Sequence, residues 1–297
     1  MTNEGIVKYM TEVLLHSSTR ASIEQLLARP AHAVLLIAPN GAGKGTTAQY
    51  LAGRMLDVEV EKLGSSAFFK SLAAKPGKAL SIEEVRDVTH YLMLKSTRQA
   101  KVRRVVLIEH AGDLTTQAQN ALLKTIEEPP EGTVLILTTV HEMDILPTIR
   151  SRVQILSLQL PSPAQLKDYF AGSGYKPAAI DKALLMSAGL PGLTQALLEG
   201  DETHPLVVAA ARAREILQKP GFERLVMIDG LVKNKQEWLD TLFIIERMAQ
   251  INLEKHGSSQ ATVKAWHNVL KFASEATSQT LASAQIKLVA LNFMLNL

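Results

Sequence analysis

The sequence predicts an α/β fold with a parallel sheet, followed by helical domains, and three observations support that prediction. Three buried-strand patterns, rich in β-branched and aliphatic residues, alternate with helical patterns: residues 33–37, 105–108 and 133–139. The first of them leads directly into a glycine-rich loop and a helix. After Pro161-Ser162-Pro163 only helical patterns follow. We therefore expect an α/β domain over residues 1–160, a small helical domain over 161–203 and an all-helical domain over 204–297.

The composition limits the classes of function. A chain of 297 residues, 46% hydrophobic and 21% charged, is typical of a soluble globular protein with more than one domain. No apolar run approaches the ~18 residues of a membrane helix, and the N-terminus lacks a signal-peptide layout, so we expect a cytoplasmic protein without a membrane partner. The absence of cysteine excludes disulfides, cysteine-bound zinc and thiol nucleophiles. A net charge of +3 permits contact with nucleic acid but does not require it.

The first part of the chain predicts a phosphate-binding loop. Residues 6–28 predict two helices, the second opened by a capping box of Ser22 and Gln25. The 33–37 strand then runs into the segment 39–47, PNGAGKGTT, and a helix. In this arrangement backbone N–H groups and a lysine hold phosphates. The expected residues of a degenerate nucleotide site are Gly41, Gly43, Lys44, Gly45, Thr46 and Glu109.

The loop departs from the usual G-x-x-x-x-G-K-[ST] pattern at both ends. Ala38 stands where the first glycine belongs, and Gly45 replaces the metal-binding hydroxyl, with Thr46 one residue further on. A G-A-G-K-G-T loop is also similar to that of nucleoside monophosphate kinases. ATP binding therefore stays open, and such a kinase is an alternative function, although the chain shows no match to the arginines of kinase lid segments.

The middle of the chain supplies the second half of the candidate site. A loop-rich link with a turn at Pro76-Gly77 precedes a helix that Ser81 and Glu84 open as a capping box. The cations just before the 105–108 strand are expected to lie in a solvated turn: Arg98, Lys101, Arg103 and Arg104. Asp113 is the expected cap of the following helix, which Pro129-Pro130 end.

The strand 105–108 ends in Glu109-His110. Nucleotide hydrolases carry an acidic pair here, in which one carboxylate holds Mg²⁺ and the other polarises water. A glutamate places its oxygen one methylene further out than an aspartate, and a neutral imidazole is a poor replacement for a carboxylate. We therefore expect weak or absent hydrolysis.

The C-terminal part ends in an apolar helix. A strand-like segment at 153–158 precedes helices at 164–170, 178–187 and up to Gly200, and longer helices follow from Pro205. The last helix, expected from about Thr280, places five residues on one stripe: Leu281, Ala284, Leu288, Leu291 and Leu295. That stripe is either buried in its own bundle or exposed for a partner subunit.

Three segments carry a resemblance to a known family: 81–86 (SIEEVR), 120–130 (NALLKTIEEPP) and 148–152 (TIRSR). With them the chain resembles the AAA+ clamp-loader subunits of bacterial DNA polymerase III, of the delta-prime type. The resemblance implies a nucleotide-binding domain, a helical lid and a collar that joins a ring of five subunits. The implied partners are ATPase subunits, the clamp-opening subunit and, through the assembled ring, primed DNA.

The resemblance also implies a role for one arginine. In this family a Ser-Arg-Cys motif supplies an arginine to the γ-phosphate held by the neighbouring subunit, and here the motif reads Ser151-Arg152-Val153. Arg152 is thus the expected catalytic residue in trans, with a plain surface ion pair as the alternative. The family's lid arginine has no counterpart in residues 190–196, and its zinc module cannot form. We expect a non-hydrolysing part of a DNA-directed DNA polymerase holoenzyme, with an ATPase that uses Thr46 as the alternative.

Overall fold

The computed structural model describes residues 13–73, 80–93, 98–254, 259–282 and 284–297. They form two compact units: an α/β unit of Met1–Gln165 with Gly172–Gly174, and a helical unit of Leu166–Ala171 with Tyr175–Leu297. A separate small domain over residues 161–203 stays a prediction. The helical pattern expected from residue 6 begins outside the described residues, and the turn expected at Pro76-Gly77 lies outside them.

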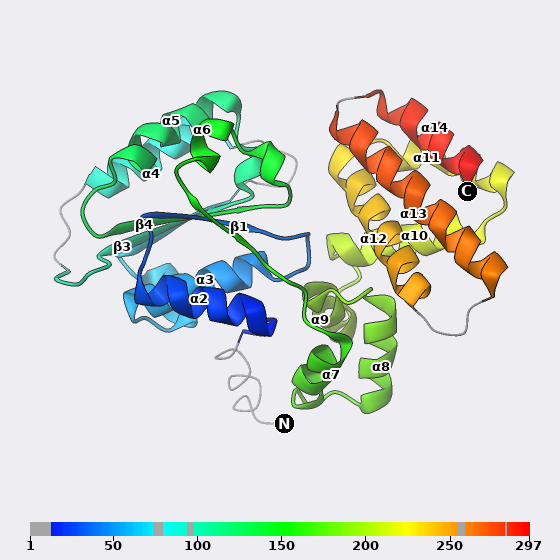
Figure 1. Cartoon of the computed structure of the whole chain (residues 1–297), viewed down its shortest axis with the longest axis horizontal. Helices are drawn as coiled ribbons and strands as arrows, with labels where there is room; N and C mark the ends of the chain where they lie inside the picture. The colour runs from blue at the N-terminus through cyan, green and yellow to red at the C-terminus, as the bar shows by residue number, and fades with distance from the viewer. Residues whose placement is uncertain (1–12, 74–79, 94–97, 255–258, 283) are drawn as a thin grey trace. The chain divides into compact units, whose positions relative to one another are not determined.

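A five-stranded parallel sheet forms the centre of the α/β unit (Figure 1). Its strands are β1 (Ala33–Ile37), β2 (Phe69–Ala73), β3 (Arg104–Glu109), β4 (Thr133–Thr139) and β5 (Gln154–Ser157). Their order is β2-β3-β4-β1-β5, and every neighbouring pair is parallel. The three central strands are the three buried-strand patterns of the sequence, and their burial confirms the predicted α/β class.

Helices cover both faces of this sheet, so that successive strand residues are buried in opposite cores (Figure 1). On one face lie α2 (Ser17–Ala28) and α3 (Lys44–Leu56). On the other lie α4 (Ile82–Met93), α5 (Thr116–Glu127) and α6 (Pro147–Arg150). Short 3₁₀ turns are η1 (Val60–Ser65), η2 (Ala111–Asp113) and η3 (Glu142–Asp144).

Strand β2 was not expected, because the segment around it was interpreted as a loop-rich link. It is an edge strand that pairs only with β3, and its sequence FKSLA lacks a continuous apolar run. An edge strand that is half-buried carries too weak a pattern for recognition from composition.

Two predicted helix caps are wrong, and one is confirmed. Ser22 lies inside α2, where its hydroxyl donates to the Ser18 carbonyl (3.1 Å). Asp113 belongs to η2, and Thr115 caps α5 instead by accepting the Ala118 N–H (3.1 Å). The capping box of Ser81 and Glu84 forms in both directions, with distances of 2.8 and 3.4 Å.

The solvated-turn interpretation of the cations before β3 is wrong for two of them. Arg104 is buried, and its Nη1 donates to the carbonyls of Tyr91 and Leu92 at the end of α4, at 3.0 Å each. Arg98 donates from Nη2 to the Leu56 carbonyl at the end of α3 (2.5 Å). These guanidinium groups satisfy carbonyls that the helix ends leave without partners.

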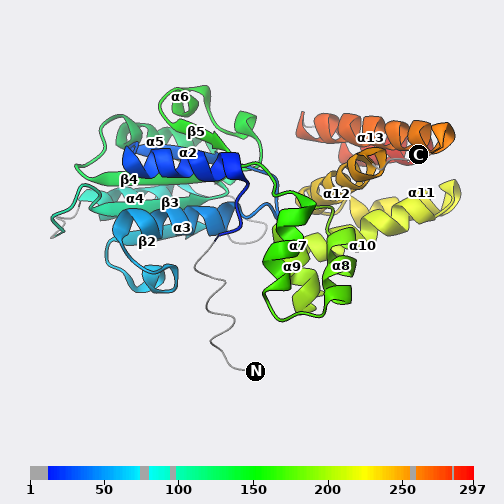
Figure 2. The same ribbon diagram turned by 60° about the horizontal axis from the view of Figure 1, so that its bottom comes forward.

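The described part of the helical unit contains no strand. Its helices are most of α7 (Pro163–Ala171), α8 (Pro177–Met186), α9 (Pro191–Glu199), α10 (Pro205–Gln218), α11 (Gly221–Leu231), α12 (Lys235–Glu254), α13 (Gln260–Leu281) and α14 (Ile286–Asn296). Helices α8 and α9 lie side by side, as do α12 and α13 (Figure 2). In the core, the Trp238 indole donates to the Thr280 hydroxyl (3.2 Å) and meets Phe293 edge-on.

The final helix begins later than predicted, and of the two alternatives for its apolar stripe the structure shows the exposed one. Thr280 and Leu281 belong to the end of α13, and α14 begins at Ile286. Its buried residues are Val289, Ala290, Phe293 and Met294. The leucines of the predicted stripe are exposed, with Leu288 at 59% and Leu295 at 65%.

The buried arginine provides a test of this packing. Arg104→Met keeps the side-chain stem but removes both hydrogen bonds to α4, so we expect the free energy of unfolding to fall by about 2–3 kcal/mol. Arg103 is the matched control, because its guanidinium pairs with Glu131 (2.9 Å) in a more exposed position. Arg103→Met should cost at most about 1 kcal/mol. Urea denaturation of both variants measures the difference, and equal losses would contradict it.

Candidate functional site

The candidate site lies where three parallel strands end. Parallel pairing places Ile37 of β1 beside Thr139 of β4, and Ile108 of β3 beside Leu137 of β4. The loop after β1 and Glu109 at the end of β3 are therefore brought to one edge of the sheet, where ligands bind in folds of this kind. The Ala38 N–H donates to the Thr139 carbonyl (3.3 Å) and fixes the start of the loop at this edge.

The glycine-rich loop has the backbone conformation of a phosphate cradle. Gly41 (φ 77°) and Gly43 (φ 86°) both adopt the left-handed conformation that favours glycine. Helix α3 begins at Lys44, and no side chain caps its N-terminus. Its first N–H groups are therefore not satisfied by a capping side chain, and this part of the predicted site suits an anion.

Lys44 lies against its own loop. Its side chain is buried, and Nζ donates to the carbonyls of Ala38 (2.7 Å) and Pro39 (3.1 Å) and to Oδ1 of Asn40 (3.3 Å). An ammonium group has three donors, and these three acceptors match them. Lys44 thus stabilises the closed loop, a structural role that sequence reasoning missed because it depends on the loop conformation.

Gly45 and Glu109 are in close proximity. A Cβ atom on Gly45 would lie 3.0 Å from Oε2 of Glu109. The glutamate carboxylate therefore occupies space next to the point from which a serine or threonine side chain would extend. The two departures seen in the sequence are therefore neighbours in the structure: the glycine at position 45 leaves room for the longer side chain of Glu109.

The remaining predicted residues of the site lie apart from this contact. Thr46 is exposed in the first turn of α3. His110 is exposed and left-handed (φ 54°), and its N–H donates to the Thr138 hydroxyl (3.0 Å). His110 therefore forms the turn after β3, and Thr138, which holds that turn, was not recognised from the sequence.

The cradle fits phosphate better than it fits the Mg²⁺ that hydrolysis requires. Magnesium needs closely held oxygen ligands at octahedral positions, and Gly45 supplies none. Within the described ranges, no group of three or more His, Asp or Glu side chains could hold a metal ion.

In the same ranges no helix is long and apolar enough to cross a membrane.

Arg152 lies between α6 and β5, and its guanidinium is held by its own chain. Nε lies 2.7 Å from Oε1 of Glu127, and Nη1 donates to the Thr148 carbonyl (3.0 Å) and the Ser151 hydroxyl (3.1 Å). The side chain remains 42% exposed. The surface ion pair that was the alternative for this residue is therefore present, and Glu127, in the segment NALLKTIEEPP, is the partner that sequence reasoning did not identify.

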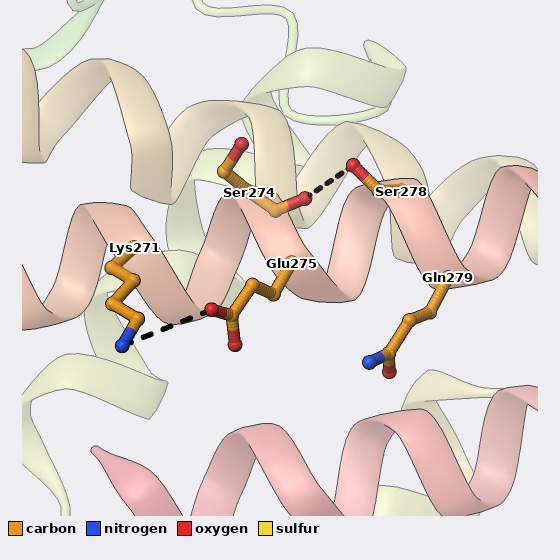
Figure 3. Close-up of a pocket in the computed structure, with 5 residues that line it drawn as sticks. All are labelled: Lys271, Ser274, Glu275, Ser278 and Gln279. Atoms are coloured by element: carbon orange, nitrogen blue, oxygen red, sulfur yellow. Dashed lines mark hydrogen bonds and ion pairs between the residues drawn. The ribbon is translucent and has the colours of Figure 1, made fainter.

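A hollow in the helical unit offers no comparable site. It has a volume of about 450 Å³ and lies along α13, where its lining residues are Lys271, Ser274, Glu275, Ser278 and Gln279 (Figure 3). All five come from one helix, and the Lys271 ammonium lies 4.0 Å from the Glu275 carboxylate. The lining has no glycine-rich loop or strand end like those beside Lys44.

These features define the class of protein: an AAA+-type α/β domain with a phosphate loop after β1, followed by a helical part. A family model described as "DNA polymerase III, delta subunit" matches residues 20–162. The resemblance to delta-prime subunits of DNA polymerase III that the three sequence segments predicted is thereby confirmed.

Two curated relatives match the chain in sequence, and a solved structure resembles it weakly. DNA polymerase III subunit delta' of Pseudomonas aeruginosa is 33% identical over 187 residues, which are 57% of this chain and 56% of that protein. Subunit gamma/tau of Mycobacterium bovis is 26% identical over 288 residues, 88% of this chain and 46% of that protein. The chain spans about half the length of these curated relatives. A gamma subunit-related structure from Thermotoga maritima is 19% identical, with a TM-score of 0.46, and the alignment covers 92% of this chain and 96% of that one.

The bonds of Lys44 within its loop lead to a prediction about stability. Lys44→Met removes the charged donor but keeps most of the stem, so we expect the free energy of unfolding to fall by about 1.5–3 kcal/mol in nucleotide-free buffer. Chemical denaturation without added nucleotide measures this loss. A lysine that served only to bind phosphate would leave this stability unchanged, and that result would contradict the structural role.

Proposed function

We propose that this chain is a non-hydrolysing subunit of the DNA polymerase III clamp loader that supplies Arg152 to ATP bound by a neighbouring subunit. The observation that carries the proposal is Gly45, which gives the loop no hydroxyl ligand for Mg²⁺, with the Glu109 carboxylate 3.0 Å from the place that a Cβ atom would take there. The engagement of Lys44 with its own loop points in the same direction. Arg152, in contrast, is an exposed cation.

The chemistry of phosphoryl transfer suits an arginine in this role. Charge is spread over the γ-phosphate oxygens in the transition state, and a planar guanidinium can donate two parallel hydrogen bonds to them. An arginine supplied by a neighbouring subunit accelerates such reactions by about 10³-fold to 10⁵-fold. Arg152 stabilises that charge, while the neighbouring subunit holds the nucleotide and its metal ion.

The helical unit offers a surface for other subunits. Exposed apolar side chains are Leu288, Leu291 and Leu295 on α14 and Phe222 and Val226 on α11. These two helices pack together, and an ion pair between Lys287 and Asp229 (2.6 Å) joins them. Large exposed apolar side chains of this kind mark protein interfaces. We assign them to contacts with the ATPase subunits and the clamp-opening subunit of a cytoplasmic ring that carries primed DNA.

The exposed guanidinium leads to the first test of this function. Arg152→Ala should lower the clamp-stimulated ATPase rate of the assembled ring by about 10³-fold. Arg150→Ala is the matched control, since Arg150 also pairs with a carboxylate of its own chain, Glu142 (3.3 Å). Size-exclusion chromatography checks that both variants enter the ring. An unchanged rate with Arg152→Ala would remove the proposed mechanism.

The exposed leucines lead to a test of assembly. Replacing Leu288 and Leu295 together by Gln should weaken incorporation into the ring by tenfold or more, an effect of about 1.4 kcal/mol. The free energy of unfolding of the isolated chain should change by no more than about 0.5 kcal/mol, because both side chains are exposed. Leu185→Gln, at an exposed position on α8, is the control. Unaltered affinity of the double variant in a titration of ring assembly would show that this surface faces solvent.

A further inference from the structure

The contact between Glu127 and Arg152 assigns a role to a second residue. We infer that Glu127 is a positioning residue that orients the Arg152 guanidinium toward the neighbouring subunit's γ-phosphate, an inference that rests on the proposed function. Oε1 of Glu127 lies 2.7 Å from Nε of Arg152, so that the carboxylate and the guanidinium form a close ion pair. The carboxylate therefore fixes one edge of the guanidinium plane.

The division of donors on the guanidinium supports this role. Nε faces Glu127, and Nη1 faces the Thr148 carbonyl and the Ser151 hydroxyl. Among the described residues, Nη2 donates no hydrogen bond. A guanidinium has five N–H donors in a fixed plane, so anchoring of one edge sets the direction of the remaining donors. Nη2 can thus donate to a phosphate while Glu127 stays bound.

Both partners are attached to a well-fixed frame. Glu127 is the last residue of α5, directly after the fully buried Ile126. Gln119 of α5 donates to the Asp144 carbonyl (2.9 Å) and accepts the Leu146 N–H (2.8 Å), which ties α5 to the segment that leads into α6. The backbones that carry the carboxylate and the guanidinium are therefore held together independently of their ion pair.

A purely stabilising role does not explain the placement of Glu127. The two side chains are 42% and 46% exposed, and exposed ion pairs contribute little to stability. A carboxylate at the C-terminus of a helix also interacts unfavourably with the helix dipole. Glu127 thus occupies an unfavourable helix position, and its closest interaction is with the one arginine proposed to act in trans.

The test uses the assembled ring with Glu127→Ala and its matched control Glu128→Ala. Alanine favours helix, so neither change threatens α5, and Glu128 is the adjacent exposed acid without an ion pair in the described chain. We expect Glu127→Ala to lower kcat of the clamp-stimulated ATPase by about tenfold, since a misplaced catalytic group costs rate. The KM for ATP and the rate with Glu128→Ala should stay close to those of the parent ring.

A double variant separates positioning from a general effect of lost charge. Because Glu127 acts through Arg152, Glu127→Ala combined with Arg152→Ala should be no slower than Arg152→Ala alone. An additive loss would overturn the inference. An unchanged rate with Glu127→Ala would also overturn it. A raised rate would overturn it as well, because the carboxylate would then restrain Arg152 from reaching the phosphate. If Arg152→Ala itself leaves the rate unchanged, the proposed function fails as well, whereas the other outcomes leave it standing.

Discussion

Parallel pairing of β1, β4 and β3 is the constraint on which the rest of the site depends. It brings the end of β1 and the end of β3 to one edge of the sheet, so that the phosphate loop and Glu109 meet there. The same pairing requires helices on both faces, and the last carbonyls of those helices then need hydrogen-bond donors. Arg104 of β3 donates to two such carbonyls at the end of α4. Sheet register thus fixes both the site and its support.

Lys44 and Arg152 are two cations in opposite environments. The Lys44 ammonium donates to three acceptors of its own loop and lies in the interior. The Arg152 guanidinium contacts Glu127, Thr148 and Ser151 and remains 42% exposed. In an interior site a cation must be satisfied by its own chain, whereas an exposed one remains available to a partner. That contrast is the physical basis for proposing an inactive pocket and an active surface residue in one protein.

Sequence patterns predicted the central strands because residues buried on both faces form long apolar runs, as in 133–139. They failed for β2, whose edge position permits polar residues, and for the cap of α5, because Asp113 and Thr115 are equally good caps and only the η2 turn decides between them. The residues of the candidate site were recognised by motif. Their interactions were not, since the contacts of Lys44 with its loop and of Glu127 with Arg152 depend on three-dimensional proximity that spacing along the chain does not specify.

The central claim is that the chain's own nucleotide site does not hydrolyse ATP, whereas Arg152 acts on ATP bound by a neighbouring subunit. The rate of ATP hydrolysis by the purified chain alone tests it most directly. Phosphate release is measured at saturating ATP and Mg²⁺, with the Lys44→Met variant measured in parallel. We predict no phosphate release above the buffer background for the parent chain or for the variant. Turnover by the parent chain that Lys44→Met abolishes would contradict the proposed division, because it would show that the pocket beside Glu109 is itself an active ATPase site.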